Sequence, residues 1–245
     1  MENTDSLKRT KIDLYDAVLN KGTTECRQWR PTLYDFLAHR ALSFLMNTEG
    51  DVSRPASRFT INGDEYLKPY PDFLNLTITN PSDSLETKYY ALKLMQDLTQ
   101  FHKNDENVNA FMDVELLRLD YVHTHSQNPK KDTLYFNSLK ALQNKFNTSE
   151  RVTEIDYRLA NWYLQKAALY RPLEGDNYKC YKKTAKEICT SAIAKFPKSY
   201  GAVECHNTIA SINAKTYNIS YEDVNEPNKP FRALVTSQNI SKLYL

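Results

Sequence analysis

The stretch AIAKFPKSYGAVECHNTIASI, residues 192–212, carries the signals of a helix end, a turn and a helix start in direct succession. Apolar residues recur at three- and four-residue spacings on both sides of Pro197, which is the pattern of amphipathic helices. Proline lacks the backbone N–H that would continue the first helix, so the chain is expected to turn at this point. The sequence therefore predicts two helices, about 177–196 and 198–214, joined by two or three residues.

A similar arrangement occurs 50 residues earlier in the chain, where Lys145-Phe146 falls on Lys195-Phe196. Apolar positions also coincide at this offset: Leu139 with Cys189, Leu142 with Ala192, Val152 with Ala202, Ile155 with Cys205, Leu159 with Ile209 and Trp162 with Ile212. The earlier copy predicts helices at about 131–146 and 149–170. Repeated helix pairs of this kind stack antiparallel and bury a continuous core, as in an α-solenoid.

The stretch 192–212 also resembles a tetratricopeptide unit, in which the proline of Lys-Phe-Pro opens the turn between one repeat and the next. The standard repeat has about 34 residues, so the 50-residue offset departs from it. The loop ALYRPLEGDNY, residues 168–178, accounts for the excess. The predicted arrangement is therefore tetratricopeptide-like rather than a regular array of repeats.

The rest of the chain is predicted to be helical as well, with one interruption. Helices are expected at about 5–20, 31–47, 84–103 and 105–124. Residues 47–81 contain two glycines and four prolines and predict a long irregular loop, with a small hairpin or irregular insert near 55–70 around Asn62-Gly63. The predicted fold class is all-α, with antiparallel helix pairs and a short β tail.

The helix that begins at Pro31 is apolar on most of its circumference, which is typical of a central, buried helix. Its one polar stripe consists of Thr32, Asp35, His39 and Ser43. Asp35 and His39 are four residues apart, so they share a helix face and could form a hydrogen bond. The pair is either a catalytic base oriented by a carboxylate or a buried polar pair that holds the central helix, and the second interpretation is favoured.

Composition excludes several classes of function. The 245 residues carry a net charge of only +2, so strong attraction to nucleic acid or to an anionic membrane surface is not expected. No apolar run is long enough to cross a bilayer. Five glycines are too few for a chain rich in nucleotide-binding loops, and the sequence motifs of nucleotide-binding, zinc-protease and serine-hydrolase sites are all missing. No catalytic, cofactor-binding or metal-binding residue is predicted, and Asp35 and His39 remain the candidates if a site exists.

The cysteines and paired histidines give weak signals of their own. None of the four cysteines forms a C-x-x-C pair, and Cys189 and Cys205 fall at apolar helix positions. Buried free thiols are favoured there over a disulfide. His123 and His125 are two residues apart at a predicted helix end, and joint binding of a metal ion would need an extended backbone, so a metal site is not favoured.

The last residues, NKPFRALVTSQNISKLYL from 228 to 245, change pattern from helix to strand. Phe231, Ala233 and Val235 share one parity, and a second short alternating run covers Leu243 to Leu245. Two strands around a turn are marginal alone, so the tail is interpreted as the start of a β-sandwich domain whose remaining strands lie outside this fragment. The predicted domains are a helical-repeat domain, 1–220, and a linker with the first strands of a truncated β-sandwich, 221–245.

Two segments together suggest a family. PTLYDFLAHRALSFL, residues 31–45, is followed by SRFTINGDEYLKPYPDF, residues 57–73, and the tail NEPNKPFRALVTSQNISKLYL occupies 225–245. In this order, with tetratricopeptide-like helices between, they resemble the N-terminal region of large α-2-macroglobulin-like proteins of Bacteroidetes-type bacteria. The resemblance implies a helical region before a series of macroglobulin-type β-sandwich domains, in a cell-envelope protein that faces the periplasm and belongs to a protease-trapping or protease-inhibiting family. The thioester motif Cys-x-Glu-Gln of that family does not occur in this chain, so no functional residue is transferred.

Three functional hypotheses follow. The leading one is a noncatalytic scaffold for protein interaction or interdomain contact, whose partners are its own downstream β-sandwich domains and proteases or other envelope proteins. The alternative is a free-standing cytoplasmic tetratricopeptide-like adaptor. The third is an enzyme that uses the stripe of Asp35 and His39.

Overall fold

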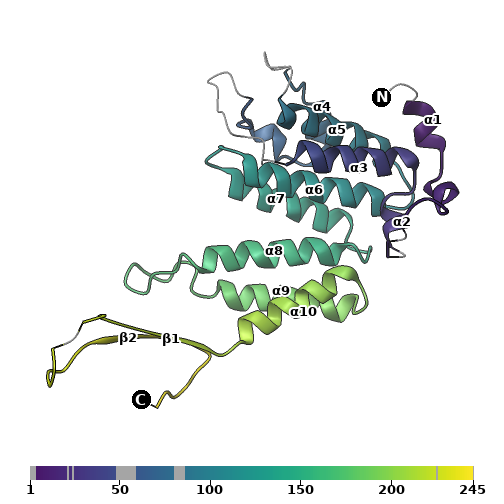
Figure 1. The fold of residues 1–245 in the computed structure, drawn as a ribbon. Coiled ribbons are helices and arrows are strands. Elements are labelled where there is room, and N and C mark those ends of the chain that lie inside the picture. The colour runs from purple at the N-terminus through teal and green to yellow at the C-terminus, as the bar shows by residue number, and fades with distance from the viewer. Residues whose placement is uncertain are drawn as a thin grey trace. The chain divides into compact units, whose positions relative to one another are not determined.

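The computed structural model describes residues 4–20, 22–23, 25–47, 59–79, 86–224 and 226–244. It is mainly helical and has a short antiparallel sheet near the C-terminus (Figure 1), which confirms the predicted helical class with a β tail. The chain divides into two compact units, Met1–Phe146 and Asn147–Leu245. The proposed domain boundary at residue 220 stays a prediction.

Unit 1 is a group of helices around α3, α5 and α6. Its elements are α1 (Thr4–Arg9), a 3-10 helix (Ile12–Tyr15), α2 (Cys26–Trp29), α3 (Leu33–Leu45), a 3-10 helix (Asp64–Tyr66), α4 (Tyr70–Asn75), α5 (Thr87–His102), α6 (Asn109–His125) and α7 (Lys131–Lys145). Helix α5 packs against both α3 and α6, and α7 packs against α6. The fully buried apolar side chains at these contacts include Ala38, Leu92, Met95, Leu98, Met112, Val114, Leu119, Val122 and Leu139.

The N-terminal segment differs from its prediction. The expected helix 5–20 is wrong, because α1 ends at Arg9 and the following residues pair with the start of α3. Thr10 O accepts a hydrogen bond from Leu33 N at 2.8 Å, and Ile12 N donates to Pro31 O at 3.0 Å. The expected start of α3 at Pro31 is also corrected. Thr32 is the N-cap, and its hydroxyl and Asp35 form a reciprocal capping box that satisfies free N–H groups of the first turn.

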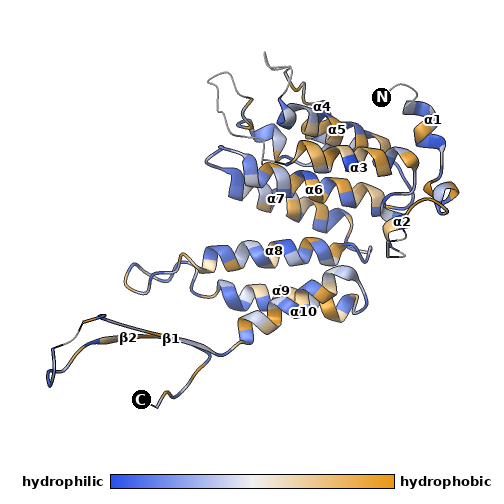
Figure 2. Cartoon of the chain, in the orientation of Figure 1, coloured by the Kyte–Doolittle hydropathy of each residue, from blue (hydrophilic) through white to orange (hydrophobic). Residues whose placement is uncertain are grey.

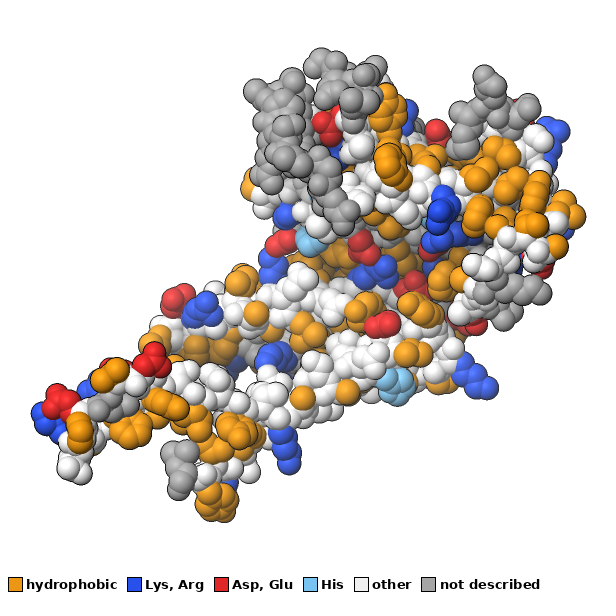
Figure 3. All heavy atoms as spheres, in the orientation of Figure 1, with side chains coloured by type: hydrophobic (Ala, Val, Ile, Leu, Met, Phe, Trp, Pro, Cys, Tyr) orange, Lys and Arg blue, Asp and Glu red, His pale blue; other side chains and the backbone are white. Residues whose placement is uncertain are grey.

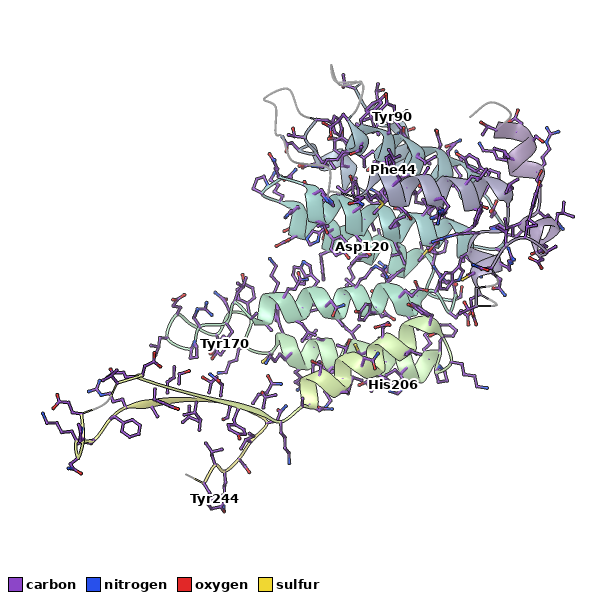
Figure 4. The ribbon with its side chains drawn as sticks, in the orientation of Figure 1. Phe44, Tyr90, Asp120, Tyr170, His206 and Tyr244 are labelled. Carbon is purple, nitrogen blue, oxygen red and sulfur yellow. The ribbon has the colours of Figure 1, made fainter. Side chains whose placement is uncertain are left out.

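Helix α3 is buried on one side only, and that side contains both the polar stripe and apolar residues such as Ala38 and Leu42. Asp35 and His39 are buried, whereas Phe44 is 75% exposed. Figure 2 shows hydrophobic residues along the outward side of α3, and Figure 4 labels Phe44 there. The prediction of an entirely buried central helix is therefore wrong, since its apolar circumference exceeds the surface that neighbouring helices cover.

The predicted irregular loop 47–81 is confirmed in part, because most of residues 59–79, the part that the structure describes, lies outside regular elements. Residues 59–79 form no strand but a 3-10 helix and α4, so the hairpin predicted around Asn62-Gly63 is wrong for this part, while residues 48–58 and 80–85 lie outside the described residues. Side chains from α5, from α7 and from the connection between α6 and α7 donate hydrogen bonds to the carbonyl groups of this segment. The side chains donate hydrogen bonds as follows: Ser126 to Ile61 O, Asn128 to Asn62 O, Ser138 to Leu67 O, and Gln96 to Phe73 O and Leu76 O.

Arg118 on α6 makes the central connection to that segment. Its guanidinium forms two hydrogen bonds with the Glu115 carboxylate, at 2.8 and 2.6 Å, and both side chains are fully buried. It also donates to Tyr66 O and Lys68 O and lies over the Phe73 ring. The buried Arg118 guanidinium thus donates hydrogen bonds to backbone carbonyls that would otherwise have no partner.

Unit 2 contains three consecutive helices, α8 (Val152–Ala167), α9 (Tyr181–Lys195) and α10 (Tyr200–Asn213). Each helix reverses the direction of the one before it, and all three pack on one another (Figure 1). The turn predicted around Pro197 is confirmed, and Ser199 caps α10 by accepting a hydrogen bond from Ala202 N. Their shared core consists of Ala160, Ala185, Cys189, Ala192 and Cys205. Cys189 and Cys205 are buried free thiols, as predicted.

Gly201 allows the closest approach within unit 2. A Cβ atom at this position would lie 2.4 Å from the Thr153 carbonyl carbon and 2.5 Å from Glu154 N, both on α8. Next to it, the hydroxyls of Thr153 and Ser199 are hydrogen-bonded at 2.8 Å. The start of α10 is therefore fixed against the first turn of α8 at a site where only glycine fits. The helices of the earlier sequence copy, α7 and α8, belong to different compact units, and the predicted stack of repeated pairs stays a prediction.

A two-stranded hairpin completes unit 2. Strand β1 (Thr216–Tyr221) pairs antiparallel with β2 (Ala233–Gln238), in a register that sets Ile219 opposite Val235. The strand predicted around Ala233 is confirmed. Its expected partner at Leu243–Leu245 is wrong over the described residues 243–244, which form no strand, and Leu245 lies outside them. The true partner, β1, lies in a segment that the sequence assigned to the helical domain.

Candidate functional site

The structure contains two candidate sites. The first is a buried polar cluster that includes Asp35 and His39, the candidates from the sequence. Asp35 and His39 share the buried face of α3, as expected, but they do not pair with each other. The Asp35 carboxylate accepts hydrogen bonds from the backbone and the hydroxyl of Thr32 at 2.9 and 2.8 Å. Its other oxygen lies 2.7 Å from Nε2 of His102, the last residue of α5.

His102 is held at both ring nitrogens. Nδ1 lies 2.6 Å from Asp105 and Nε2 contacts Asp35, and the imidazole is 3% exposed. Burial alone would lower the pKa of His102, but the hydrogen bonds and charges of Asp35 and Asp105 outweigh it and raise the pKa. His102 thus favours the protonated form, and its hydrogen bond with Asp35 joins the end of α5 to the start of α3.

His39 lies in a different environment. Its Nε2 is 3.6 Å from the Asp113 carboxylate on α6, which also accepts a hydrogen bond from Arg30 Nε at 3.2 Å. Burial and the Arg30 charge lower the pKa of His39 to about 4, and the opposing charges of Asp113 and Asp35 do not compensate. His39, Arg30 and Ser43 line a pocket of about 360 Å³ together with apolar side chains that include Leu42 and Leu117.

The arrangement predicts a pH dependence of stability that can be measured. The unfolded state binds a proton on His39 near pH 6.5, whereas the folded state does so only near pH 4. Stability therefore falls as the pH drops through this window, by about 1.4 kcal/mol per unit, or about 2 kcal/mol from pH 6.5 to 5. Urea unfolding at pH 7 and pH 5 is expected to show that the wild type loses about 2 kcal/mol more stability on acidification than His39→Gln does.

His102 changes stability with pH in the opposite direction, and it does so in both the wild type and His39→Gln. Because its pKa is raised, its stabilising contribution is complete below its unfolded value and is lost as the pH rises through the folded one. A wild type and a His39→Gln variant that lose equal stability on acidification would contradict the assignment to His39.

The cluster offers acid–base groups but no complete catalytic constellation. No serine or cysteine among the described residues is hydrogen-bonded to either ring of this cluster, since both partners of His102 are carboxylates and the ring of His39 lies next to the Asp113 carboxylate. No group of three or more His, Cys, Asp or Glu side chains is placed to hold a metal ion within the described ranges. What the geometry does support is the joining of α3, α5 and α6.

The remaining histidines lie apart from this cluster. His123 Nε2 is 2.8 Å from Asp132, and its ring stacks on Tyr135 at 4.3 Å. His125 is bonded through Nδ1 to the carbonyl of Tyr121. Both belong to the last turn of α6, so the extended backbone that joint metal binding would need is not formed there. His206 is exposed on α10, where Figure 4 labels it.

The second candidate site is the β1–β2 hairpin, whose two faces differ in character. The first face carries Tyr217, Ile219 and Tyr221 from β1 opposite Ser237, Val235 and Ala233 from β2, with Phe231 beyond the strand end. The ring of Phe231 is 6.4 Å from that of Tyr221. The other face carries Thr216, Asn218 and Ser220 opposite Gln238, Thr236 and Leu234. We call the first the apolar face of the hairpin.

The apolar face is exposed. Tyr217, Tyr221 and Phe231 are each more than 60% exposed, and no residue of either strand is buried. Figure 3 shows hydrophobic side chains gathered along this hairpin. Among the described residues there is no third strand. An amphipathic two-stranded sheet with one apolar face in water is the signature of a surface that binds another layer.

The base of the hairpin is anchored to α10. The side chain of Asn239, which has a positive φ of 57°, donates to Ile212 O at 2.7 Å and to Ala214 O at 2.9 Å. Gln238 donates to the same Ile212 carbonyl and accepts from Lys182 on α9. These bonds satisfy carbonyls at the end of α10 and hold the root of the hairpin while its strands extend beyond the helices.

Sequence reasoning missed two parts of these sites. It did not identify His102 as a candidate, because its partner Asp35 is 67 residues away and no local signal joins them. It also missed β1, although the alternation of Tyr217, Ile219 and Tyr221 in TYNISY is visible in the sequence and matches the parity of Ala233 and Val235.

Comparison with known proteins returned no family model, no curated protein and no solved structure that matches this chain. None of the described helices has the length and apolar character to cross a membrane.

Proposed function

We propose that this chain is a noncatalytic scaffold that contacts β-sandwich domains through the apolar face of its hairpin. The main support for this proposal is the exposure of Tyr217, Tyr221 and Phe231 on one face of a two-stranded sheet. Two strands alone are marginally stable in water, so packing against a second apolar sheet would stabilise the hairpin and cover its aromatic side chains. Face-to-face packing of this kind is how two sheets form a sandwich.

The setting of the proposal follows from the family resemblance. An α-2-macroglobulin-like envelope protein of the protease-trapping family would place macroglobulin-type sandwich domains after the helical region, in the periplasm. The helices α8, α9 and α10 would then be part of a tetratricopeptide-like stack that presents the hairpin. The anchoring of the hairpin base by Asn239 supports such a role, because it fixes where the strands leave the helices.

Photo-cross-linking in the cells of origin tests the proposal. Benzoylphenylalanine in place of Tyr221 is expected to cross-link to a β-sandwich domain, identified by mass spectrometry of the joined peptides. Adding Ile219→Lys is expected to reduce the yield by roughly tenfold or more, because a charge would be buried at the interface. Thr236→Lys on the polar face is the matched control and should leave the yield unchanged.

The alternative, a cytoplasmic adaptor, predicts a different cross-linking pattern. Exposed apolar side chains also occur on α10, where Tyr200 and Val203 are each more than half exposed. An adaptor that binds through its helices would cross-link from Tyr200 and not from Tyr221. That outcome would contradict the hairpin proposal and favour the adaptor.

A further inference from the structure

Unit 2 holds two thiols next to each other in its core. Cys189 on α9 and Cys205 on α10 are both fully buried and belong to one cluster of packed side chains. A hydrogen bond between the two thiols lowers the pKa of Cys189 and raises the pKa of Cys205, whose burial acts in the same direction. Both thiols thus lie in one buried cluster, where α9 packs against α10.

The surroundings of the pair bring α9 and α10 close together. Ala160, Ala185 and Ala192 complete the fully buried cluster, and larger side chains such as Leu164, Ile188 and Ile209 pack against its edge. A disulfide requires Cα atoms about 4.4–6.8 Å apart. Alanines in the same cluster as the two cysteines are compatible with that spacing.

We infer that Cys189 and Cys205 are a disulfide site, at which α9 and α10 become covalently linked when the protein meets a disulfide oxidant. The Cys189 thiolate attacks one sulfur of the oxidant and displaces a thiolate, which takes up a proton. The Cys205 thiol then loses its proton and attacks Cys189 in the mixed disulfide, releasing the second thiol. The two cysteines lose two electrons and two protons, and the oxidant disulfide becomes two thiols.

The bond would stabilise unit 2. It closes the loop 189–205, which contains the turn at Pro197 and the start of α10 that is fixed against α8 by Gly201. A loop of this length restricts the unfolded chain enough to lower the unfolding equilibrium constant on the order of 100-fold. The effect should be confined to unit 2.

The experiment uses the full chain with Cys26→Ser and Cys180→Ser, which remove the two exposed thiols. After incubation with oxidised glutathione, the intact mass is expected to fall by about 2 Da, the two hydrogens lost. Digestion with trypsin should yield EICTSAIAK, residues 187–195, joined to SYGAVECHNTIASINAK, residues 199–215. A mixed disulfide with glutathione that persists, or no reaction of the folded protein, would overturn the inference.

A stability measurement separates a native disulfide from a distorting one. The chain has two tryptophans, Trp29 in unit 1 and Trp162 in unit 2, so Trp29→Phe leaves a fluorescence signal from unit 2 alone. Oxidation is expected to raise the urea midpoint of this signal, and dithiothreitol should reverse the shift. Cys205→Ala, the matched control, should show no shift. A lower midpoint after oxidation would show that the bond does not fit the folded helices.

Discussion

Arg118→Met is expected to destabilise unit 1 by about 3–5 kcal/mol, the largest effect of any single substitution considered for this chain. The substitution leaves the Glu115 carboxylate buried without its partner and removes the donors to Tyr66 O and Lys68 O. Methionine fills most of the volume, so the loss reports charge and hydrogen bonding rather than a cavity. Urea unfolding followed by Trp29 fluorescence in a Trp162→Phe background measures it.

Two further variants identify the cause of that loss. Arg40→Met makes the same chemical change at an exposed position of α3 and should alter stability by less than about 0.5 kcal/mol. The double variant Arg118→Met/Glu115→Gln removes the buried charge and should recover part of the stability, but not the part due to the two carbonyls. Equal losses in the single and double variants would mean that the Glu115 charge contributes nothing.

Gly201→Val is expected to destabilise unit 2 by about 3 kcal/mol, at the upper end of overpacking effects. The added Cβ would meet the backbone of Thr153 and Glu154, which cannot move aside as a flexible side chain could. The start of α10 would have to shift away from α8, which would also break the hydrogen bond between Thr153 and Ser199. Trp162 fluorescence in a Trp29→Phe background reports the midpoint.

Ala210→Val is the matched control, because it adds a β-branched side chain at an exposed position of the same helix. Its cost should be limited to helix propensity, about 0.5 kcal/mol. If Gly201→Val proved no more costly than Ala210→Val, the close packing of α8 and α10 in solution would be refuted.

The predictions that succeeded rest on local signals. The turn at Pro197 and the helices on either side of it follow from spacing and from proline chemistry within a few residues, and the structure has them there. The same holds for the strand around Ala233 and Val235, whose alternation is visible without knowledge of its partner. Local pattern identifies an element, but it does not identify what the element packs against.

The predictions that failed depend on distant partners. The hairpin predicted around Asn62-Gly63 does not form within residues 59–79, whose carbonyls accept hydrogen bonds from the side chains of Gln96, Arg118, Asn128 and Ser138 rather than from a partner strand. The burial of the whole circumference of α3 was wrongly predicted, because no pattern within α3 reveals which neighbouring helices cover it or that His102 on α5 binds Asp35. Asp35 and His39 were correctly placed on one face, but their partners come from α5 and α6.

The hydrogen bonds of Asn239 have a mechanical consequence. They join the end of the hairpin directly to the last carbonyls of α10, so tension applied to the chain beyond residue 239 reaches the helices without crossing the strand pair. The two strands therefore carry no load until the hydrogen bonds of Asn239 break. A load along the polypeptide would therefore be borne by the final turn of α10.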